Sequence, residues 1–200
     1  MKKGVAVALE VGALYSEQEC WDLIEAYEQT KTPFMLMENA CYNKDELLAD
    51  AMTKDDCFGE IVYCHGAYMH DLRNQLAYGE LKRHFRQSEY LTRNRDSYPT
   101  HDLGPIARIL NINCGNRMVS LCSRASKARG LNAYAKEREE VSYLADTHFA
   151  QGDIVETLIT CENGELISLR LDTTLPTFYN RELMVRGTKG LYDQNAIWFC

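Results

Sequence analysis

The chain has 200 residues, of which 46% are hydrophobic and 26% are charged, as is typical of a globular domain. Its net charge of -7 argues against general nucleic-acid binding, because neutralising phosphates requires a surplus of lysine and arginine. Only four prolines and twelve glycines are present, and no apolar run reaches the roughly 18–20 residues that a bilayer span needs. We therefore expect a globular chain that binds neither nucleic acid nor a membrane.

The first fifty residues alternate between strand and helix patterns. Residues 5–9 and 33–37 are apolar runs of strand length, which predict strands buried on both faces. Between them, Ser16 and Glu19 form a capping box that starts a helix, and a second helix is expected over 43–52. This order of elements predicts a parallel α/β sheet.

After Cys57 the pattern becomes one of strands. The Asn163-Gly164 pair accepts positive φ and predicts a hairpin turn between two of them. We expect a mostly antiparallel sheet with short helices covering one face. The predicted strands are 60–68, 118–123, 154–161, 165–172, 181–186 and 196–199.

Helices are less clearly marked in this half. Residues 72–95 are polar and partly helical, and the basic run from Lys82 to Arg95 is diluted by acidic residues, as in a solvated helix face. A short helix is expected over 106–110. Residues 124–150 predict either a long mobile loop or a helix such as 133–144.

Cysteine usage bears on metal binding and on compartment. The eight cysteines show no disulfide-scaffold spacing, and most lie in apolar surroundings, so we expect buried, reduced thiols and a cytoplasmic location. Cys57, Cys64, His65 and His70 are the nearest approach to a metal cluster. They contain neither a C-x-x-C knuckle nor an H-E-x-x-H pair, so we predict no metal site.

Two segments place polar side chains at predicted strand ends, where sites are usually built. Glu38 follows the second strand at its carboxyl end, where open α/β sheets bind ligands, although a structural carboxylate is an equal alternative. Tyr68, His70 and Asp71 bring a phenol, an imidazole and a carboxylate within four residues. This set suits proton transfer, but a tyrosine at a strand end is more often part of the core.

The most specific string is Tyr98-Pro99-Thr100-His101-Asp102-Leu103-Gly104-Pro105. Its prolines fix the backbone around His101, and imidazole is well suited to accept a proton near neutral pH, with a structural histidine as the alternative. Residues 175–181 add Tyr179, a weaker signal. Several tyrosines beside one histidine and one glutamate suit a sugar, because phenols and carboxylates bond hydroxyl groups while aromatic faces pack on ring C–H groups.

Together these strings resemble the Gfo/Idh/MocA oxidoreductase superfamily and, within it, the NAD-dependent glycosidases of glycoside hydrolase family 109, which are α-N-acetylgalactosaminidase-like. The resemblance covers nearly the whole chain. Its motifs follow one another in the order of the family, at Glu10-Val11, 36–42, 66–72, 98–105, 111–117, 172–181 and 187–190.

The resemblance implies that substrate is held and activated by Glu38, Tyr68, Tyr98, His101 and Tyr179. In such enzymes NAD+ takes a hydride from carbon-3 of the sugar, the neighbouring C–H becomes acidic, and the glycosidic bond is eliminated. Water then adds, and NADH returns the hydride. His101 with Tyr98 would handle the carbon-3 hydroxyl proton, and Tyr68 or Tyr179 would serve the carbon-2 proton or the leaving oxygen.

The same resemblance assigns the other site residues and the domains. Arg181 would join the substrate-binding residues, while Glu10, Glu38 and Asn39 would lie at the cofactor. Residues 1–55 would be the end of a Rossmann domain, and residues 56–200 a larger open-faced sheet domain for substrate and oligomerisation. The chain has no Gly-x-Gly-x-x-Gly turn, so we expect a truncated portion of a longer enzyme.

Whether this chain is itself an enzyme is left open. The alternatives are a fragment of a sugar or cyclitol dehydrogenase, which would release NADH in proportion to substrate, and an inactive oligomerisation or interaction domain. The expected partners are a sugar or glycoside, together with a second copy bound through the open sheet or a missing Rossmann half. An exposed apolar edge at the first strands predicts pairing or aggregation.

Overall fold

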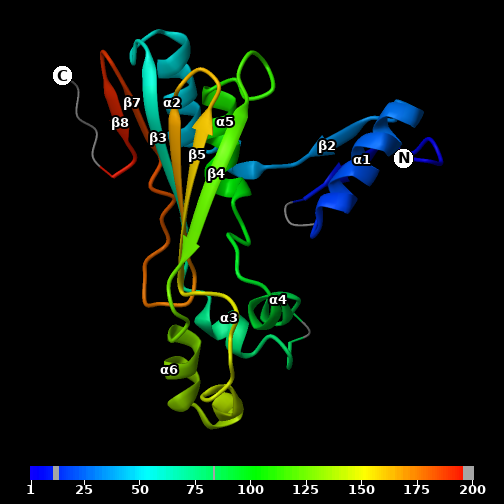
Figure 1. Cartoon of the computed structure of the whole chain (residues 1–200), viewed down its shortest axis with the longest axis vertical. Coiled ribbons are helices and arrows are strands. Elements are labelled where there is room, and N and C mark those ends of the chain that lie inside the picture. Colours follow the sequence, from blue (N-terminus) through cyan, green and yellow to red (C-terminus); the bar gives the residue numbers. More distant parts are fainter. Residues whose placement is uncertain (11–13, 83, 196–200) are drawn as a thin grey trace. The chain divides into compact units, whose positions relative to one another are not determined.

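A computed structural model describes residues 1–10, 14–82 and 84–195 (Figure 1). They belong to two compact units, Met1–Asn39 and Ala40–Cys200. The strand predicted at 196–199 lies outside the described residues, as does Val11 of the first family-like motif. None of the helices in the described ranges is long and apolar enough to cross a membrane.

The first unit is a β-α-β arrangement, as predicted. Strand β1 (Val7–Leu9) pairs in parallel with β2 (Phe34–Leu36), and helix α1 (Glu17–Thr30) connects them. The capping box is confirmed: the Glu19 N–H donates to the Ser16 hydroxyl at 3.2 Å, and the Ser16 N–H donates to Glu19 Oε2 at 3.1 Å.

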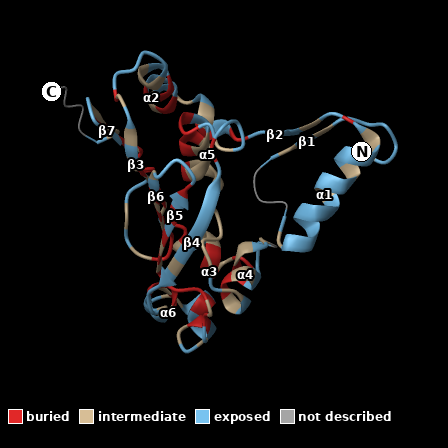
Figure 2. Ribbon diagram, turned by 45° about the horizontal axis from the view of Figure 1, so that its top comes forward, coloured by how far each residue is buried: buried red, intermediate tan, exposed pale blue. Residues whose placement is uncertain are grey.

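The prediction that these two strands are buried on both faces is wrong. Val5, Met35 and Leu36 are 65%, 62% and 47% exposed, and α1 has no buried residue. Figure 2 accordingly shows α1 mostly in pale blue. One helix and two short strands carry too few side chains to cover both faces of a sheet, so the apolar strand residues stay exposed.

The second unit is built on a mixed six-stranded sheet in the order β4-β5-β6-β3-β7-β8. Neighbouring strands are antiparallel except β3 and β6, which are parallel. The prediction of a mostly antiparallel sheet is confirmed, and β8 is a strand that the sequence pattern did not mark. The strands are β3 (Ile61–Met69), β4 (Met118–Ala125), β5 (Ile154–Cys161), β6 (Leu166–Asp172), β7 (Met184–Gly187) and β8 (Leu191–Asp193).

Alternating side chains bury one face of this sheet. Leu169 of β6 and Val185 of β7 are buried in a core that includes Ile106 of helix α5 (Thr100–Ile109) and Ala49 of helix α2 (Lys44–Lys54). Leu158, on the other face, is 48% exposed. The predicted arrangement, with helices covering one face, is therefore confirmed for the described residues.

The remaining helices are short. Two of them lie within 72–95, where partial helix was predicted, and two lie within 124–150, where a loop and a helix were the alternatives. The fifth, over Asn39–Tyr42, was not predicted. The helices are η1 (Asn39–Tyr42), α3 (Arg73–Ala77), α4 (Arg86–Thr92), α6 (Gly130–Lys136) and the 3-10 helix η2 (Glu139–Leu144).

One helix begins earlier than predicted. The sequence placed it at 106–110, whereas α5 starts at Thr100 and contains Pro105. Pro99 has a φ of -77°, close to the helical value, and its carbonyl accepts the Leu103 N–H at 2.8 Å, which closes the first turn. His101 therefore lies in the first turn of a helix, ahead of the predicted start.

The prediction that most cysteines are buried is wrong. Cys122 shows why, because it lies on β4, an edge strand with few covering neighbours, so its apolar sequence context does not bury it. All described cysteines are free thiols, and a cytoplasmic location stays a prediction. Cys64 and Cys161 are buried, Cys41 is half-buried, and Cys20, Cys57, Cys114 and Cys122 are exposed.

Candidate functional site

Four predicted site residues meet near the carboxyl end of β3. The ring centroid of Tyr68, on β3, lies 4.9 Å from that of Tyr98, 5.6 Å from His101 and 6.4 Å from Tyr179. The rings of Tyr98 and His101 are 4.9 Å apart and nearly perpendicular, at 79°. With His70, whose ring lies 5.2 Å from Tyr179, these residues form what we term the aromatic cluster.

The contact between α5 and β3 positions His101. Asp102 and Ile106 are buried, lie one helical turn apart on α5, and face Gly66 of β3, which has no side chain to hold them off. Because α5 rests directly on the strand at this glycine, His101 at the start of the helix is held close to Tyr68.

Main-chain pairing positions Tyr179. Its neighbour Asn180 exchanges two hydrogen bonds with Met69, each of 3.0 Å, so this segment runs beside the last residues of β3. Tyr179 is 54% exposed, whereas Tyr68 is 6% exposed. The aromatic cluster therefore has a buried phenol at its base and an accessible one at its surface.

Two groups of the aromatic cluster have shifted pKa values. Burial raises the pKa of Tyr68 to about 12, although Arg86 acts against the shift. Burial, together with the positive charge of Arg86, lowers the pKa of His70 from its usual 6.5. A neutral phenol and a neutral imidazole thus lie together near pH 7, with Tyr68 Oη 3.1 Å from His70 Nδ1.

Arg86 is a site residue that sequence reasoning missed. Its guanidinium carbon lies 4.9 Å from the centroid of the Tyr98 ring, within the range of a cation–π contact. The run from Lys82 to Arg95 was predicted to be a solvated helix face, and for the half-buried Arg86 that prediction is wrong. No spacing in the run distinguishes Arg86 from Arg95, which pairs with Glu89 at 2.8 Å.

Arg181 faces α2. Its Nη2 lies 2.5 Å from Oε1 of Glu46, and the two residues are 9% and 2% exposed. Asn43, with its amide oxygen turned toward the guanidinium, accepts two further hydrogen bonds at 2.7 and 3.1 Å. Burial raises the pKa of Glu46 in spite of the opposing effect of Arg181. The charge of Arg181 is therefore engaged inside the protein.

The other predicted site residues lie in the first unit. Glu10 follows β1, and Glu38 and Asn39 follow β2, so all three lie at the edge where these parallel strands end. Glu10 and Asn39 are exposed, and Glu38 is 7% exposed. Carboxylate and amide groups can bond ribose hydroxyls and a carboxamide.

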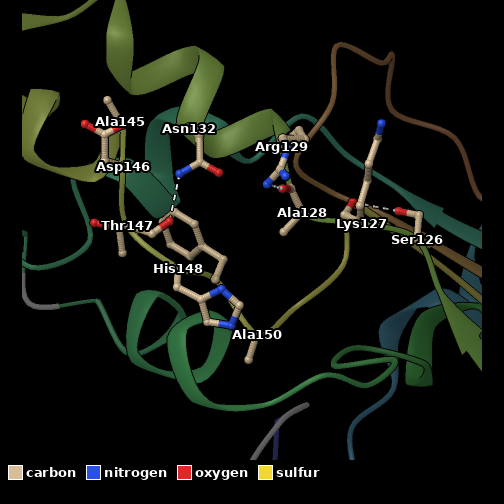
Figure 3. A pocket seen from close by; sticks show the side chains of 11 residues that line it. Ser126, Lys127, Ala128, Arg129, Asn132, Ala145, Asp146, Thr147, His148 and Ala150 are labelled. Carbon is tan, nitrogen blue, oxygen red and sulfur yellow. Dashed lines mark hydrogen bonds between the residues drawn. The ribbon is translucent and has the colours of Figure 1, made fainter.

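Two pockets of the second unit contain none of the predicted site residues. One of about 650 Å³ lies between the start of α6 and the segment 145–150, where the Asn132 amide donates to the Thr147 carbonyl at 2.9 Å (Figure 3). Another of about 410 Å³ borders α5, β4 and β5 and includes Asp96. Across the part of the chain that the structure describes, no three His, Cys, Asp or Glu side chains could hold a metal ion.

Sequence comparison identifies relatives for nearly the whole chain. The family model "Glycosyl hydrolase 109, C-terminal domain" matches residues 42–198. An α-N-acetylgalactosaminidase of Tannerella forsythia is 38% identical over 222 residues, which cover 99% of this chain and 47% of the relative. A glycosyl hydrolase family 109 protein of Stenotrophomonas maltophilia is 39% identical over 211 residues, covering 96% and 46%. The chain thus spans about half the length of these curated relatives.

Solved structures share the fold. An inositol dehydrogenase homolog from Azotobacter vinelandii, complexed with NADH and myo-inositol, has a TM-score of 0.67 at 18% identity, covering 94% of this chain and 44% of that one. The myo-inositol 2-dehydrogenase of Lactobacillus plantarum has a TM-score of 0.65 at 15% identity, covering 94% and 50%. These dehydrogenases show the shared fold, and the family model with the curated relatives confirms the resemblance to family 109.

Proposed function

Because the chain belongs to glycosyl hydrolase family 109, we propose that it is the substrate-binding portion of an NAD-dependent glycosidase acting on N-acetyl-α-galactosaminides. The substrate class comes from the relative named α-N-acetylgalactosaminidase. The observation that carries the proposal is the convergence of Tyr68, Tyr98, His101 and Tyr179, which come from separate segments. Phenols and an imidazole in one accessible cluster suit sugar hydroxyl groups.

The described residues fit the cofactor in part. Glu10, Glu38 and Asn39 could bond the nicotinamide carboxamide and its ribose, but the chain has no glycine-rich turn to cradle a pyrophosphate. NAD, when bound, would supply the acceptor and donor of a hydride. The residues of this chain would bind the sugar and move its protons.

The roles of these residues follow from their surroundings. His101, beside Tyr98, would accept the proton of the sugar hydroxyl that is oxidised. Tyr68, whose pKa burial raises to about 12, stays protonated near neutral pH and would bind a sugar hydroxyl as a neutral phenol. The exposed Tyr179 would serve the neighbouring C–H proton or the leaving oxygen.

The helix-free face of the six-stranded sheet is the surface that we propose for homo-oligomerisation. His65 and Arg170 point away from the core, and each pairs with Glu182, at 3.2 and 3.4 Å. Arg170 also bonds Glu156 at 2.6 Å, beside the exposed Leu158. A separate Rossmann half is the other proposed partner. Sedimentation of the chain at tens of micromolar tests the first proposal, which a monodisperse monomer would contradict.

Titration calorimetry with methyl N-acetyl-α-galactosaminide tests the binding function. We expect saturable binding that Tyr179→Ala weakens about tenfold, a loss of the size expected for one aromatic contact. The matched control is Phe178→Ala, because Phe178 is the aromatic residue that directly precedes Tyr179 and is 70% exposed. Absence of sugar binding at millimolar concentration contradicts the proposal and favours an interaction domain.

A second assay separates the two enzymatic alternatives. Titration with NAD+ and NADH, each alone, establishes whether this chain binds the cofactor. If it does, cleavage of the nitrophenyl N-acetyl-α-galactosaminide without net NADH formation supports the glycosidase. NADH accumulating in proportion to substrate supports a dehydrogenase instead.

A further inference from the structure

The hydrogen bond between Tyr68 and His70 has no part in the roles proposed above. We infer that His70 is a positioning residue for Tyr68: its Nδ1 accepts a hydrogen bond from the Tyr68 hydroxyl and so directs the lone pairs of the phenol oxygen toward an incoming sugar hydroxyl. The inference rests on the proposed function and assigns a role within the same site.

Backbone geometry and main-chain pairing place the side chains of Tyr68 and His70 next to each other. Tyr68 lies in β3 and His70 directly follows its last residue, two positions on, so the two side chains lie on the same side of the chain. The His70 N–H donates to the Asp172 carbonyl at 2.9 Å, which extends the pairing with β6 by one residue. The edge of the imidazole meets the Tyr179 ring at 86°. Strand pairing and a ring contact thus fix the imidazole with Nδ1 3.1 Å from Tyr68 Oη.

The direction of this hydrogen bond follows from burial. Tyr68 is 6% exposed, and a buried phenol O–H needs an acceptor. Within the described part of the chain, His70 Nδ1 is the one hydrogen-bond partner of the Tyr68 hydroxyl. If Nδ1 carried the imidazole proton, the phenol proton would have no acceptor. The bond therefore assigns the proton of the neutral imidazole to Nε2.

Burial and the nearby charge of Arg86 keep the imidazole of His70 neutral. The titratable and charged groups that act on it are Tyr68, Tyr179, Arg86 and Asp71. Burial and Arg86 lower its pKa, and Asp71 opposes them. The imidazole is therefore neutral near pH 7, so that with its one proton on Nε2 the Nδ1 atom can accept a hydrogen bond. When His70 gains a proton at lower pH, Nδ1 becomes a donor and the Tyr68 hydroxyl must turn.

A measurement without sugar or cofactor tests the bond itself. Nitrogen-detected NMR of the 200-residue chain, with the His70 signals assigned by their loss in His70→Asn, reports the tautomer and the titration. We expect the proton on Nε2. Tyr68→Phe removes the donor that stabilises neutral imidazole, so the pKa of His70 should rise. A proton on Nδ1, or a titration that Tyr68→Phe leaves unchanged, overturns the inference.

Sugar binding tests the positioning role. His70→Phe keeps a ring but lacks the acceptor, so affinity for methyl N-acetyl-α-galactosaminide at pH 7.5 should fall about fivefold to tenfold. His70→Asn carries an oxygen near the position of Nδ1 and does not titrate. It should keep the affinity and abolish the weakening that we expect for the unaltered chain once the pH is low enough to protonate His70, which a series of titrations from pH 7.5 downward measures. The matched control is His148→Asn, because His148 is exposed and lines the separate pocket beside α6, so its loss should leave this pH dependence in place.

The two measurements separate the inference from the proposed function. If the sugar binds equally well to the unaltered chain and to His70→Phe, the inference fails and the proposed function stands. If no sugar binds while the proton lies on Nε2 and Tyr68→Phe raises the pKa of His70, the hydrogen bond is established and the proposed function fails.

Discussion

Gly66 of β3 and Asp102 of α5 approach each other so closely that a Cβ added at Gly66 would lie 2.9 Å from the Asp102 Cβ and 3.1 Å from Ile106 Cδ1. Both contacts are shorter than side chains ordinarily make. The glycine thus sets how closely the helix lies on the strand, and with it the 5.6 Å between the rings of Tyr68 and His101.

Gly66→Ala should push α5 away from β3. Overpacking of this kind costs about 1–3 kcal/mol of the free energy of unfolding, and the moved helix should also weaken sugar binding. Urea denaturation measures the first effect and calorimetry the second. Ser168→Ala, on the neighbouring strand and the opposite face, should change stability by less than about 0.5 kcal/mol. Equal stabilities of the two variants would show that the close contact does not hold the helix in place.

Arg86→Gln should raise the pKa values of both His70 and Tyr68. The positive charge disfavours imidazolium and favours phenolate, so its removal moves both titrations upward. NMR titration of labelled histidine and tyrosine measures both changes. Arg93→Gln is the control, because Arg93 pairs with Glu89 at 3.4 Å. A fall in either pKa would mean that Arg86 does not act on the aromatic cluster through its charge.

Asp96→Asn should stabilise the chain at neutral pH. Burial raises the pKa of Asp96 from 3.8 to about 6, and Oδ2 is buried with no hydrogen-bond partner among the described residues. The unfolded chain loses this proton at lower pH than the folded one, so stability falls as pH rises from about 4 through 6. Asparagine cannot ionise and keeps the Oδ1 that accepts the Tyr98 N–H at 3.2 Å.

The expected gain for Asp96→Asn is on the order of 2 kcal/mol at pH 7.5, disappearing by about pH 4. Urea denaturation at a series of pH values measures it. Asp146→Asn, which changes an exposed carboxylate, serves as the control and should show no such pH-dependent gain. A gain that is the same at every pH would assign the effect to something other than ionisation.

Arg181→Met should destabilise the second unit by about 3 kcal/mol, because Glu46 would keep a buried charge without its cation. Glu46→Gln in the same chain removes that charge and should restore most of the loss in denaturation experiments. The double variant also tests the predicted substrate-binding role of Arg181. If the double variant regains stability while its sugar affinity stays low, Arg181 contacts the substrate as well as forming the ion pair with Glu46.

The parts of the fold predicted from sequence are those fixed by local signals. The strand-like run 154–161 was predicted with the observed bounds of β5, and Gly164, with a φ of 99°, provides the turn that joins β5 to β6. Burial was predicted less well, because it depends on neighbours that no local pattern encodes. Leu121 is apolar and strand-forming but 68% exposed, since β4 is an edge strand with little packed on it.

The site residues likewise divide into those that local sequence strings predicted and those that only tertiary packing reveals. The family-like strings identified Tyr68, Tyr98, His101 and Tyr179, each within its own segment. Arg86 has no such string, and only the packing of α4 brings its charge to the Tyr98 ring. The partner of the Tyr68 hydroxyl likewise needed coordinates, because adjacency in sequence placed His70 nearby without showing which nitrogen it presents.

The position of β3 in the sheet has a consequence for synthesis. This strand lies in the first half of the sequence, but its neighbours are β6 at Leu166–Asp172 and β7 at Met184–Gly187. During synthesis β3 therefore has no strand partner in the sheet until β6 and β7 have been made. Pairing between strands so far apart in the sequence forms slowly. Tyr179 reaches its place only when Asn180 pairs with Met69. The aromatic cluster is thus among the last parts of the second unit to acquire its final shape.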